Sequence, residues 1–367
     1  MERSRARDIG IEIGHFETGP HNAITDVEGV MVGHCTIIKG KGKLIPGKGP
    51  VRTGVTVILP HQNNPFKMKV RASAFVINGF GKPIGLIQLN ELGQLETPIA
   101  LTNTLNVGLV ADAIIDYMLQ LNPDIGVTTG TVNPVVLECN DSYLNDIRGR
   151  HVKHQHVFEA IRKAKSGQVE EGAVGAGTGM SAFEFKGGIG TSSRKLPAKL
   201  GGYTIGALVL SNFGRREDLT IAGVPVGWEL RNYMRSPQPQ KGGSIVMIIA
   251  TDAPLTARQL HRLAKRATHG LARTGSYSSH GSGDFVVAFS TAIKIPHYPE
   301  TATYEEKVLA EKNMTPLFKA ASESVEEAII NSILKAVTMD GRDDHIRCAI
   351  PIDKLIDIMT KYRRLKK

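Results

Sequence analysis

Three unbroken apolar runs most constrain what this chain can fold into. They are "YTIGALVLSN" (203–212), "SIVMIIAT" (244–251) and "GDFVVAFSTA" (283–292). A strand with one face in water alternates apolar and polar residues, whereas a continuous apolar run indicates a strand that is buried on both faces. Such strands belong to a sheet that is covered on both sides, usually by helices. The sequence therefore predicts an α/β fold.

Segments between these runs predict further strands and several helices. Strands are expected at 54–60, 73–79 and 133–141. Apolar residues at helical spacing predict helices within 103–123 and at 154–167, 256–271, 315–339 and 352–362. The charged, Pro- and Gln-rich stretch 214–243 is expected to be an exposed connection, because the apolar strands on both sides of it look like parts of one core. We therefore expect a single domain over residues 1–367.

Composition and charge narrow the classes of function. The net charge is +10, but the basic residues are mostly scattered and aromatics make up only 5% of the chain, so a nucleic-acid surface is not favoured. Three cysteines without C-x-x-C spacing fit a protein of the reducing cytoplasm that has no disulfides and no structural zinc. We also expect no signal peptide and no membrane helix, since no run approaches the ~20 apolar residues that a membrane span needs.

Motifs of several enzyme classes are incomplete. The glycine block 171–195 lacks both the preceding strand and the acidic residue about 20 positions later that a dinucleotide site needs. The histidines within 151–156 and the stretch "DGRDDH" (340–345) are expected to be solvated, and we expect no metal. The G-x-S-x-G elbow of the α/β-hydrolases is absent. A Ser-His-Asp triad drawn from separate segments stays open.

Ser244 stands where a Pro/Gln-rich linker ends and the most apolar strand begins, directly after two glycines. A serine hydroxyl is a weak nucleophile that needs a base, and an N-terminal amine can serve as one. Cleavage of the Gly243–Ser244 bond would give Ser244 such an amine. The two glycines before Ser244 allow the backbone to adopt the strained conformation that cleavage of the bond requires, at low steric cost. On local pattern alone, an ordinary turn before a core strand explains the same residues.

Other polar residues lie at the ends of predicted strands. Ser282 and Asp284 open the third apolar run, where a hydroxyl and a carboxylate can orient an amine or relay its proton. Asn212 ends the first run, and Tyr143 follows the strand at 133–141; both can donate hydrogen bonds to an oxyanion. Glu138, Asp141 and Asp146 flank Tyr143 in sequence, and each can attract a substrate ammonium group. Each also has a purely structural explanation as a turn former, packing residue or cap.

Taken together, these segments resemble the L-aminopeptidase/D-esterase family, which includes the β-aminopeptidases. The resemblance covers nearly the whole chain, in six ordered blocks. They are "GPHNAITDVEGVMVGHCTI", "TVNPVVLECNDSYLNDIRG", "GAVGAGTGMSAFEFKGGIGTSSR", "GALVLSNFG", "GGSIVMIIATDAPL" and "GLARTGSYSSHGSGDFVVAFST". Six blocks in the order of the family are far more specific than any single motif.

The resemblance implies a four-layer α/β/β/α sandwich like that of the N-terminal-nucleophile hydrolases. It implies self-cleavage between Gly243 and Ser244, which yields an α chain 1–243 and a β chain 244–367. Ser244 would be the nucleophile of an aminopeptidase that also acts on amides and esters. Its supporting groups would be Ser282 and Asp284 (Glu in some members), the oxyanion donors Asn212 and Tyr143, and Glu138 for the substrate amine.

The resemblance further implies that no metal or organic cofactor takes part and that the chain forms a homo-oligomer, with a tetramer suggested. Two alternatives remain from the residues themselves. One is an uncleaved, non-catalytic protein of the same fold that binds small molecules. The other is an enzyme that holds a phosphate or nucleotide cofactor with the glycines of 171–190.

Overall fold

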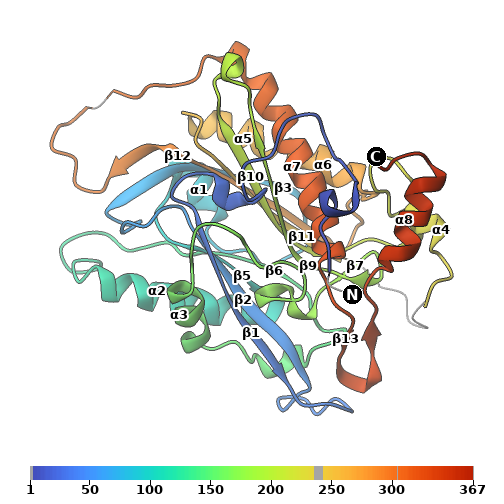
Figure 1. The fold of residues 1–367 in the computed structure, drawn as a ribbon. Helices are drawn as coiled ribbons and strands as arrows, with labels where there is room; N and C mark the ends of the chain where they lie inside the picture. The colour runs from blue at the N-terminus through green and yellow to red at the C-terminus, as the bar shows by residue number, and fades with distance from the viewer. Residues whose placement is uncertain (1–2, 235–242, 304, 367) are drawn as a thin grey trace.

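The computed structural model describes residues 3–234, 243–303 and 305–366, which form two stacked sheets between layers of helices (Figure 1). The strands of the larger sheet are β3 (Met68–Gly79), β4 (Gln94–Leu95), β9 (Gly188–Lys195), β10 (Thr204–Asn212), β11 (Gly243–Thr251) and β12 (Ser282–Pro296). Their spatial order is β4-β3-β12-β11-β10-β9. Within it β11 and β12 run parallel, and the other neighbours are antiparallel. The three apolar runs are therefore adjacent strands at the centre of the sheet.

The smaller sheet consists of β1 (Met31–Lys39), β2 (Val51–Leu59), β5 (Ile99–Asn103) and β6 (Val135–Cys139), in that spatial order. Its inner face packs on the larger sheet through one apolar cluster. Ile58 and Leu101 of the smaller sheet share this cluster with Leu208, Val246 and Val287 of the larger one. The two faces of β11 thus point into different cores, which explains why its sequence does not alternate.

Helices cover both outer faces (Figure 1). On the smaller sheet lie α2 (Val107–Leu121) and α3 (His154–Arg162). On the larger sheet lie α5 (Ala257–Ala264), α6 (Ala267–Arg273) and the long α7 (Met314–Leu334). The remaining helices are α1 (Leu86–Leu92), α4 (Val226–Glu229) and α8 (Ile352–Lys361). The order of layers is α/β/β/α, as predicted.

Among the described residues, one helical segment, Thr104–Leu121, is long and apolar enough to cross a membrane by length and composition alone. In the structure it contains α2, whose Val110, Ile114 and Met118 are fully buried against the smaller sheet. Such a helix is typical of the core of a globular protein.

Two helix predictions need correction. The helix expected at 256–271 is two helices, because α5 packs on β3 and β12 whereas α6 packs on α7. At Gly270 a side chain would come within 2.5 Å of the Ser322 carbonyl oxygen, so α6 and α7 are in close contact. The helix expected at 315–339 ends at Leu334 instead. The chain then enters a small hairpin of β13 (Met339–Asp340) and β14 (Ile346–Arg347).

The expectation that 214–243 is an exposed connection is wrong for its first half. Arg216, Leu219, Ile221 and Val226 are buried, and α4 contacts α8. The burial was not predicted because the apolar residues of this stretch are isolated between charged residues and do not recur at helix or strand spacing. Residues 235–242 of the same stretch lie outside the described part of the chain.

The glycine block allows backbone segments to pack closely against one another. Gly175–Gly179 forms a buried 3-10 turn against β2. A side chain at Gly179 would meet the Arg52 carbonyl oxygen at 2.2 Å, and one at Gly54 would meet the Gly175 carbonyl oxygen at 2.4 Å. Only glycine permits this approach of backbone to backbone. A buried turn of this kind does not offer the open cradle that a phosphate needs.

Candidate active site

Four of the predicted site residues, Asn212, Ser244, Ser282 and Asp284, lie at one end of three adjacent strands. Asn212 is the last residue of β10, and it pairs with Ser244 near the start of β11. Ser282 is the first residue of β12 and pairs with Gly243, while Gly283 pairs with Ser244. Because β10 runs antiparallel to β11 and β12 runs parallel to it, these ends coincide. The fold therefore brings together residues that are 70 positions apart.

Ser244 is buried, with only 7% of its surface exposed. Its hydroxyl donates a hydrogen bond of 2.7 Å to the carbonyl oxygen of Gly243. The hydroxyl oxygen of Ser244 therefore lies next to the carbonyl group of the peptide bond that precedes it. Strand pairing to β10 and β12 on both sides fixes the backbone at this point.

Ser282 and Asp284 form a buried pair beside Ser244. The Ser282 hydroxyl donates to Oδ1 of Asp284 at 2.5 Å. Burial raises the pKa of Asp284, and the hydrogen bond from Ser282 partly opposes that rise. A carboxyl group with a raised pKa exchanges a proton more readily near neutral pH, as an acid-base relay requires.

The orientation of the Asn212 amide is fixed by two backbone groups. Its Oδ1 accepts from the backbone N–H of Ser181 at 2.9 Å, and its Nδ2 donates to the carbonyl oxygen of Asn140 at 2.9 Å. The Nδ2 group is thus identified as the donor end. Asn212 lies opposite Ser244 in the strand register, so its amide is placed to reach an oxyanion if one forms at the Ser244 hydroxyl.

Tyr143 lies after β6, in contact with the hairpin β13–β14. Its ring stacks on His345 with 4.5 Å between ring centroids, and the guanidinium carbon of Arg347 lies 3.6 Å from its centroid. Arg347 in turn donates from Nε to the Ser181 hydroxyl at 3.0 Å. Tyr143 is therefore connected through Arg347 and Ser181 to Asn212, the other predicted oxyanion donor.

Glu138 is almost fully buried at the end of β6. One carboxylate oxygen accepts from the backbone N–H of Lys82 at 3.1 Å, and the other accepts from the hydroxyl of Thr104. The neighbouring Cys139 has a pKa well above its ordinary value, chiefly through burial and then through the charges of Glu138 and Asp284. Glu138 thus belongs to the acidic surroundings of the site, with both oxygens already bonded by the chain. Its contact with a substrate amine stays a prediction.

Sequence reasoning missed Ser181 and Arg347. Ser181 belongs to β7 (Ser181–Ala182), which pairs with β8 (Phe185–Lys186). The ammonium group of Lys186 holds this hairpin by donating to the carbonyls of Gly177, Met180 and Gly187 at 2.7–2.9 Å. The hairpin turn forces Phe183 and Glu184 into positive φ. No local sequence pattern indicates that Ser181 and Arg347 belong to the site, because their places in it depend on contacts between distant segments.

Asp141, close to the site in sequence, supplies a test of the electrostatics. It is fully buried, and burial raises its pKa from 3.8 to about 7, while hydrogen bonds from Thr53 and Asn145 oppose the rise. Between these two values the native state keeps a proton that the unfolded chain releases. The contribution of Asp141 to the free energy of unfolding therefore falls as pH rises through this window and is constant above it, at about 1.4 kcal/mol per pKa unit.

We expect Asp141→Asn to remove this dependence, since its side chain is neutral at every pH. The free energy of unfolding of the variant, relative to that of the parent, should rise between pH 4 and pH 7. Urea unfolding at pH 5 and pH 8, in a Ser244→Ala background so that one chain unfolds, measures the change. The exposed Asp353→Asn should show no such trend. A parallel pH dependence in parent and Asp141→Asn would contradict the prediction.

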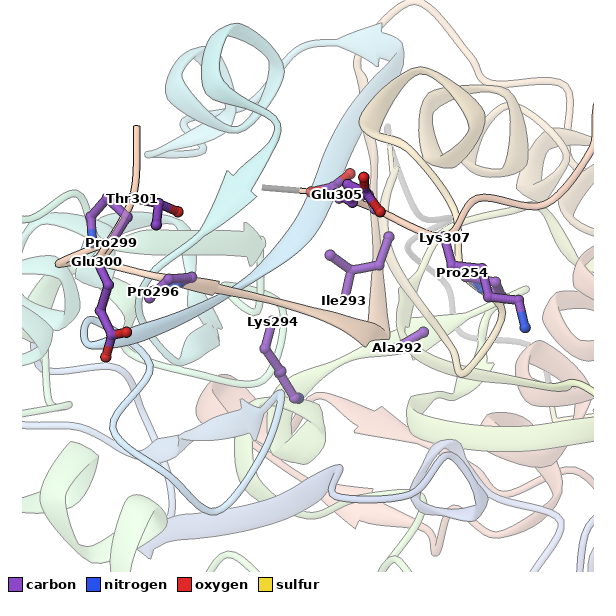
Figure 2. Close-up of a pocket in the computed structure, with 11 residues that line it drawn as sticks. Pro254, Ala292, Ile293, Lys294, Pro296, Pro299, Glu300, Thr301, Glu305 and Lys307 are labelled. Carbon is purple, nitrogen blue, oxygen red and sulfur yellow. The ribbon is translucent and has the colours of Figure 1, made fainter. Parts of the chain in front are cut away.

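Two cavities lie outside these contacts. A groove of about 1060 Å³ runs between α1 and β3, and Gly79 and Phe285 line the end nearest the site. A smaller cavity of about 430 Å³ lies at the far end of β12, beside Ile293, Lys294 and residues 299–301 and 305–307 (Figure 2). Ile293 and Ser282 are 11 residues apart on one strand, roughly 35 Å at the usual rise. The smaller cavity is therefore not part of the site.

The motifs considered for metals have other partners. His151 pairs with Asp146, and His154 pairs with Asp112 and Asp116 at the surface. The Nδ1–H of His345 donates to the Tyr143 carbonyl oxygen at 2.8 Å. Within residues 3–234, 243–303 and 305–366, no group of three His, Cys, Asp or Glu side chains is arranged to hold a metal ion.

Solved structures share this fold along their whole length. The PH0078 protein from Pyrococcus horikoshii OT3 is 65% identical, with a TM-score of 0.94 over 99% of this chain and 100% of that one. The L-aminopeptidase D-Ala-esterase/amidase from Ochrobactrum anthropi is 40% identical, with a TM-score of 0.91 over 99% of each chain. That enzyme is described as a prototype for the serine aminopeptidases and a new variant of the Ntn hydrolase fold. The present chain has the same N-terminal-nucleophile-type architecture, and the predicted fold class is confirmed.

Sequence comparison gives the same class of protein. The β-peptidyl aminopeptidase BapA of Sphingosinicella microcystinivorans is 42% identical over 99% of this chain and 94% of its own length. Residues 22–347 match peptidase family S58, and the chain belongs to this family. It is therefore a hydrolase, a serine-type aminopeptidase, as the six sequence blocks predicted.

Proposed function

We propose that this aminopeptidase matures by cleaving itself between Gly243 and Ser244, and that Ser244 then releases N-terminal amino acids from short peptides, amides and esters. The contact between the Ser244 hydroxyl and the Gly243 carbonyl oxygen carries the proposal. It places the hydroxyl for an attack on its own preceding peptide bond. The products, residues 1–243 and 244–367, would stay together because β11 pairs with strands of both chains.

Self-cleavage begins when the Ser244 oxygen bonds to the carbonyl carbon of Gly243. The C–N bond then breaks, the Ser244 nitrogen takes a proton, and an ester joins Gly243 to the serine oxygen. Water hydrolyses this ester, which leaves a carboxylate on Gly243 and returns the proton to the hydroxyl. The new amine of Ser244 can now act as the base for its own side chain.

Substrate hydrolysis repeats this chemistry with an external carbonyl group. The Ser244 oxygen attacks the carbonyl carbon of the first residue, and its proton passes by way of the free amine to the leaving amine or alcohol. Asn212 and Tyr143 donate to the oxyanion. Water then attacks the acyl-enzyme and releases the amino acid. Ser282 and Asp284 hold the amine and share its proton, as their hydrogen bond and the raised pKa of Asp284 suggest.

We expect the purified protein to consist of two chains and to hydrolyse amino-acid amides without added metal or cofactor. Intact mass spectrometry should find masses for 1–243 and 244–367. The names of the relatives suggest a substrate panel of L-, D- and β-aminoacyl amides with N-acetylated controls. A free N-terminal amine should be required. A single full-length chain with full peptidase activity would overturn the maturation step, and equal cleavage of N-acetylated substrates would overturn aminopeptidase specificity.

We further propose that the enzyme is cytoplasmic and forms homo-oligomers. Cys35, Cys139 and Cys348 are free thiols, which suits a reducing compartment. Along the 1060 Å³ groove, the large apolar side chains of Val76, Ile87 and Leu92 are exposed. Exposed apolar side chains gathered on one face are typical of a contact between subunits.

A further inference from the structure

Arg347 is a buried cation that forms no ion pair with the residues that the structure describes. Its exposed fraction is 1%, and only Nε makes a hydrogen bond, to the Ser181 hydroxyl at 3.0 Å. Both Nη1 and Nη2 are buried without a hydrogen-bond partner among the described residues, and Glu184 acts on the guanidinium only through its charge. A buried guanidinium usually has its charge paired and its donors satisfied, because desolvation is costly. Burial of this guanidinium is therefore costly, and its contacts indicate a role beyond packing.

Those contacts lead to both predicted oxyanion donors. The guanidinium lies on the face of the Tyr143 ring, 3.6 Å from the centroid. Through Nε it holds Ser181, and the backbone N–H of Ser181 holds Oδ1 of Asn212 at 2.9 Å. Tyr143 follows β6 of the smaller sheet, whereas Asn212 ends β10 of the larger one. Arg347 thus spans the two sheets at the point where the donors must converge.

We propose that Arg347 is a positioning residue that aligns Tyr143 and Asn212 toward the carbonyl attacked by Ser244 and polarises the Tyr143 phenol. This inference rests on the proposed function of those three residues. A cation over an aromatic face draws electron density from the ring, so the phenolic O–H becomes a stronger donor. Its positive charge lies in a desolvated region, where it also favours the negative charge of the tetrahedral intermediate. Arg347 itself does not contact the reacting atoms.

The test compares Arg347→Met and Arg347→Lys in the wild-type and Tyr143→Phe backgrounds, with one aminoacyl amide as substrate. Loss of a whole oxyanion donor costs about 10²–10³ in rate, so misalignment and weaker polarisation should lower kcat about tenfold or more in Arg347→Met, with KM nearly unchanged. Lysine keeps the charge but not the planar fork, so Arg347→Lys should recover part of the loss. In the Tyr143→Phe background the loss caused by Arg347→Met should shrink, because one of its two targets is gone.

A matched control removes the same kind of contact elsewhere. Arg266 lies over the Phe318 ring at 4.2 Å on the helical layer, and Arg266→Met should leave kcat unchanged. Circular dichroism and intact mass spectrometry report whether each variant folds and matures. If Arg347→Met folds but stays uncleaved, the rate of its self-cleavage replaces kcat as the measurement, since both reactions form the same oxyanion. If it does not fold, Arg347→Lys in both backgrounds carries the test.

Several results would overturn the role of Arg347. They are a kcat within twofold of wild type in both variants, a change confined to KM, or the same fold-loss with and without the Tyr143 hydroxyl. Ser244→Ala in the same assay separates this failure from that of the proposed function. Activity that survives in Ser244→Ala contradicts the function itself, whereas activity lost there but unchanged in the Arg347 variants contradicts only the present inference.

Discussion

Ser244→Ala is expected to yield one chain of full length without measurable hydrolysis of any aminoacyl amide. The substitution removes the oxygen that lies 2.7 Å from the Gly243 carbonyl oxygen. Neither the acyl shift nor the acyl-enzyme can then form. Rate losses of about 10⁶-fold are known for removal of a catalytic serine, so activity should fall below detection. Gel electrophoresis, intact mass spectrometry and an amide assay together measure the outcome.

Ser290→Ala is the matched control for this substitution. Ser290 is a buried serine on the neighbouring strand β12, and its hydroxyl donates to the Ala253 carbonyl oxygen at 2.6 Å. It pairs with Thr251 at the opposite end of β11, away from the site. This variant should lose some stability but remain cleaved and active. Cleavage that persists in Ser244→Ala would show that another group or a protease cuts the chain, and the maturation proposal would be wrong.

The layered fold is well determined by the sequence because its central strands are buried on both faces. The runs that contain Leu208, Val246 and Val287 show this directly, and all three side chains lie in the core between the sheets. Helices α2, α3 and α8 follow from amphipathic spacing. The breaks in other helices do not, because they depend on partners. The change of packing partner between α5 and α6 and the close approach at Gly270 become visible only in three dimensions.

The site could be predicted in part, for a physical reason. Ser244, Asn212 and Ser282 stand at the ends of apolar strands, so their polar side chains interrupt a strong pattern and attract attention. Ser181 and Arg347 do not interrupt an apolar pattern, since they lie in short hairpins of mixed composition. Their importance arises from hydrogen bonds and ring contacts that join segments about 166 residues apart. The burial of the first half of 214–243 was not predicted for the same reason. Arg216 is buried through contacts with the turn at Phe183 and Glu184, which is distant in sequence.

Asn212→Asp is expected to lower kcat by about 10²–10³ with little change in KM, and to let the uncleaved chain accumulate. The substitution preserves the size of the side chain and an oxygen for the Ser181 N–H. It replaces the Nδ2 donor by a second oxygen, which faces the Asn140 carbonyl oxygen and the developing oxyanion. Hydrogen-bond donation is thereby exchanged for repulsion at the one step where negative charge forms. Because self-cleavage and substrate hydrolysis pass through the same kind of tetrahedral species, both rates should fall together.

Asn212→Ala and Asn133→Ala complete this test. Asn212→Ala removes the donor without adding a charge, so it should be impaired less than Asn212→Asp, and the difference measures the electrostatic repulsion. Asn133 is an exposed asparagine that bonds to Glu96 beside the groove, and its loss should leave both rates near those of wild type. Steady-state kinetics give kcat and KM, and a time course of intact mass gives the cleavage rate. If Asn212→Asp cleaves itself at the wild-type rate and only KM changes, Asn212 binds substrate in its ground state and does not stabilise the oxyanion.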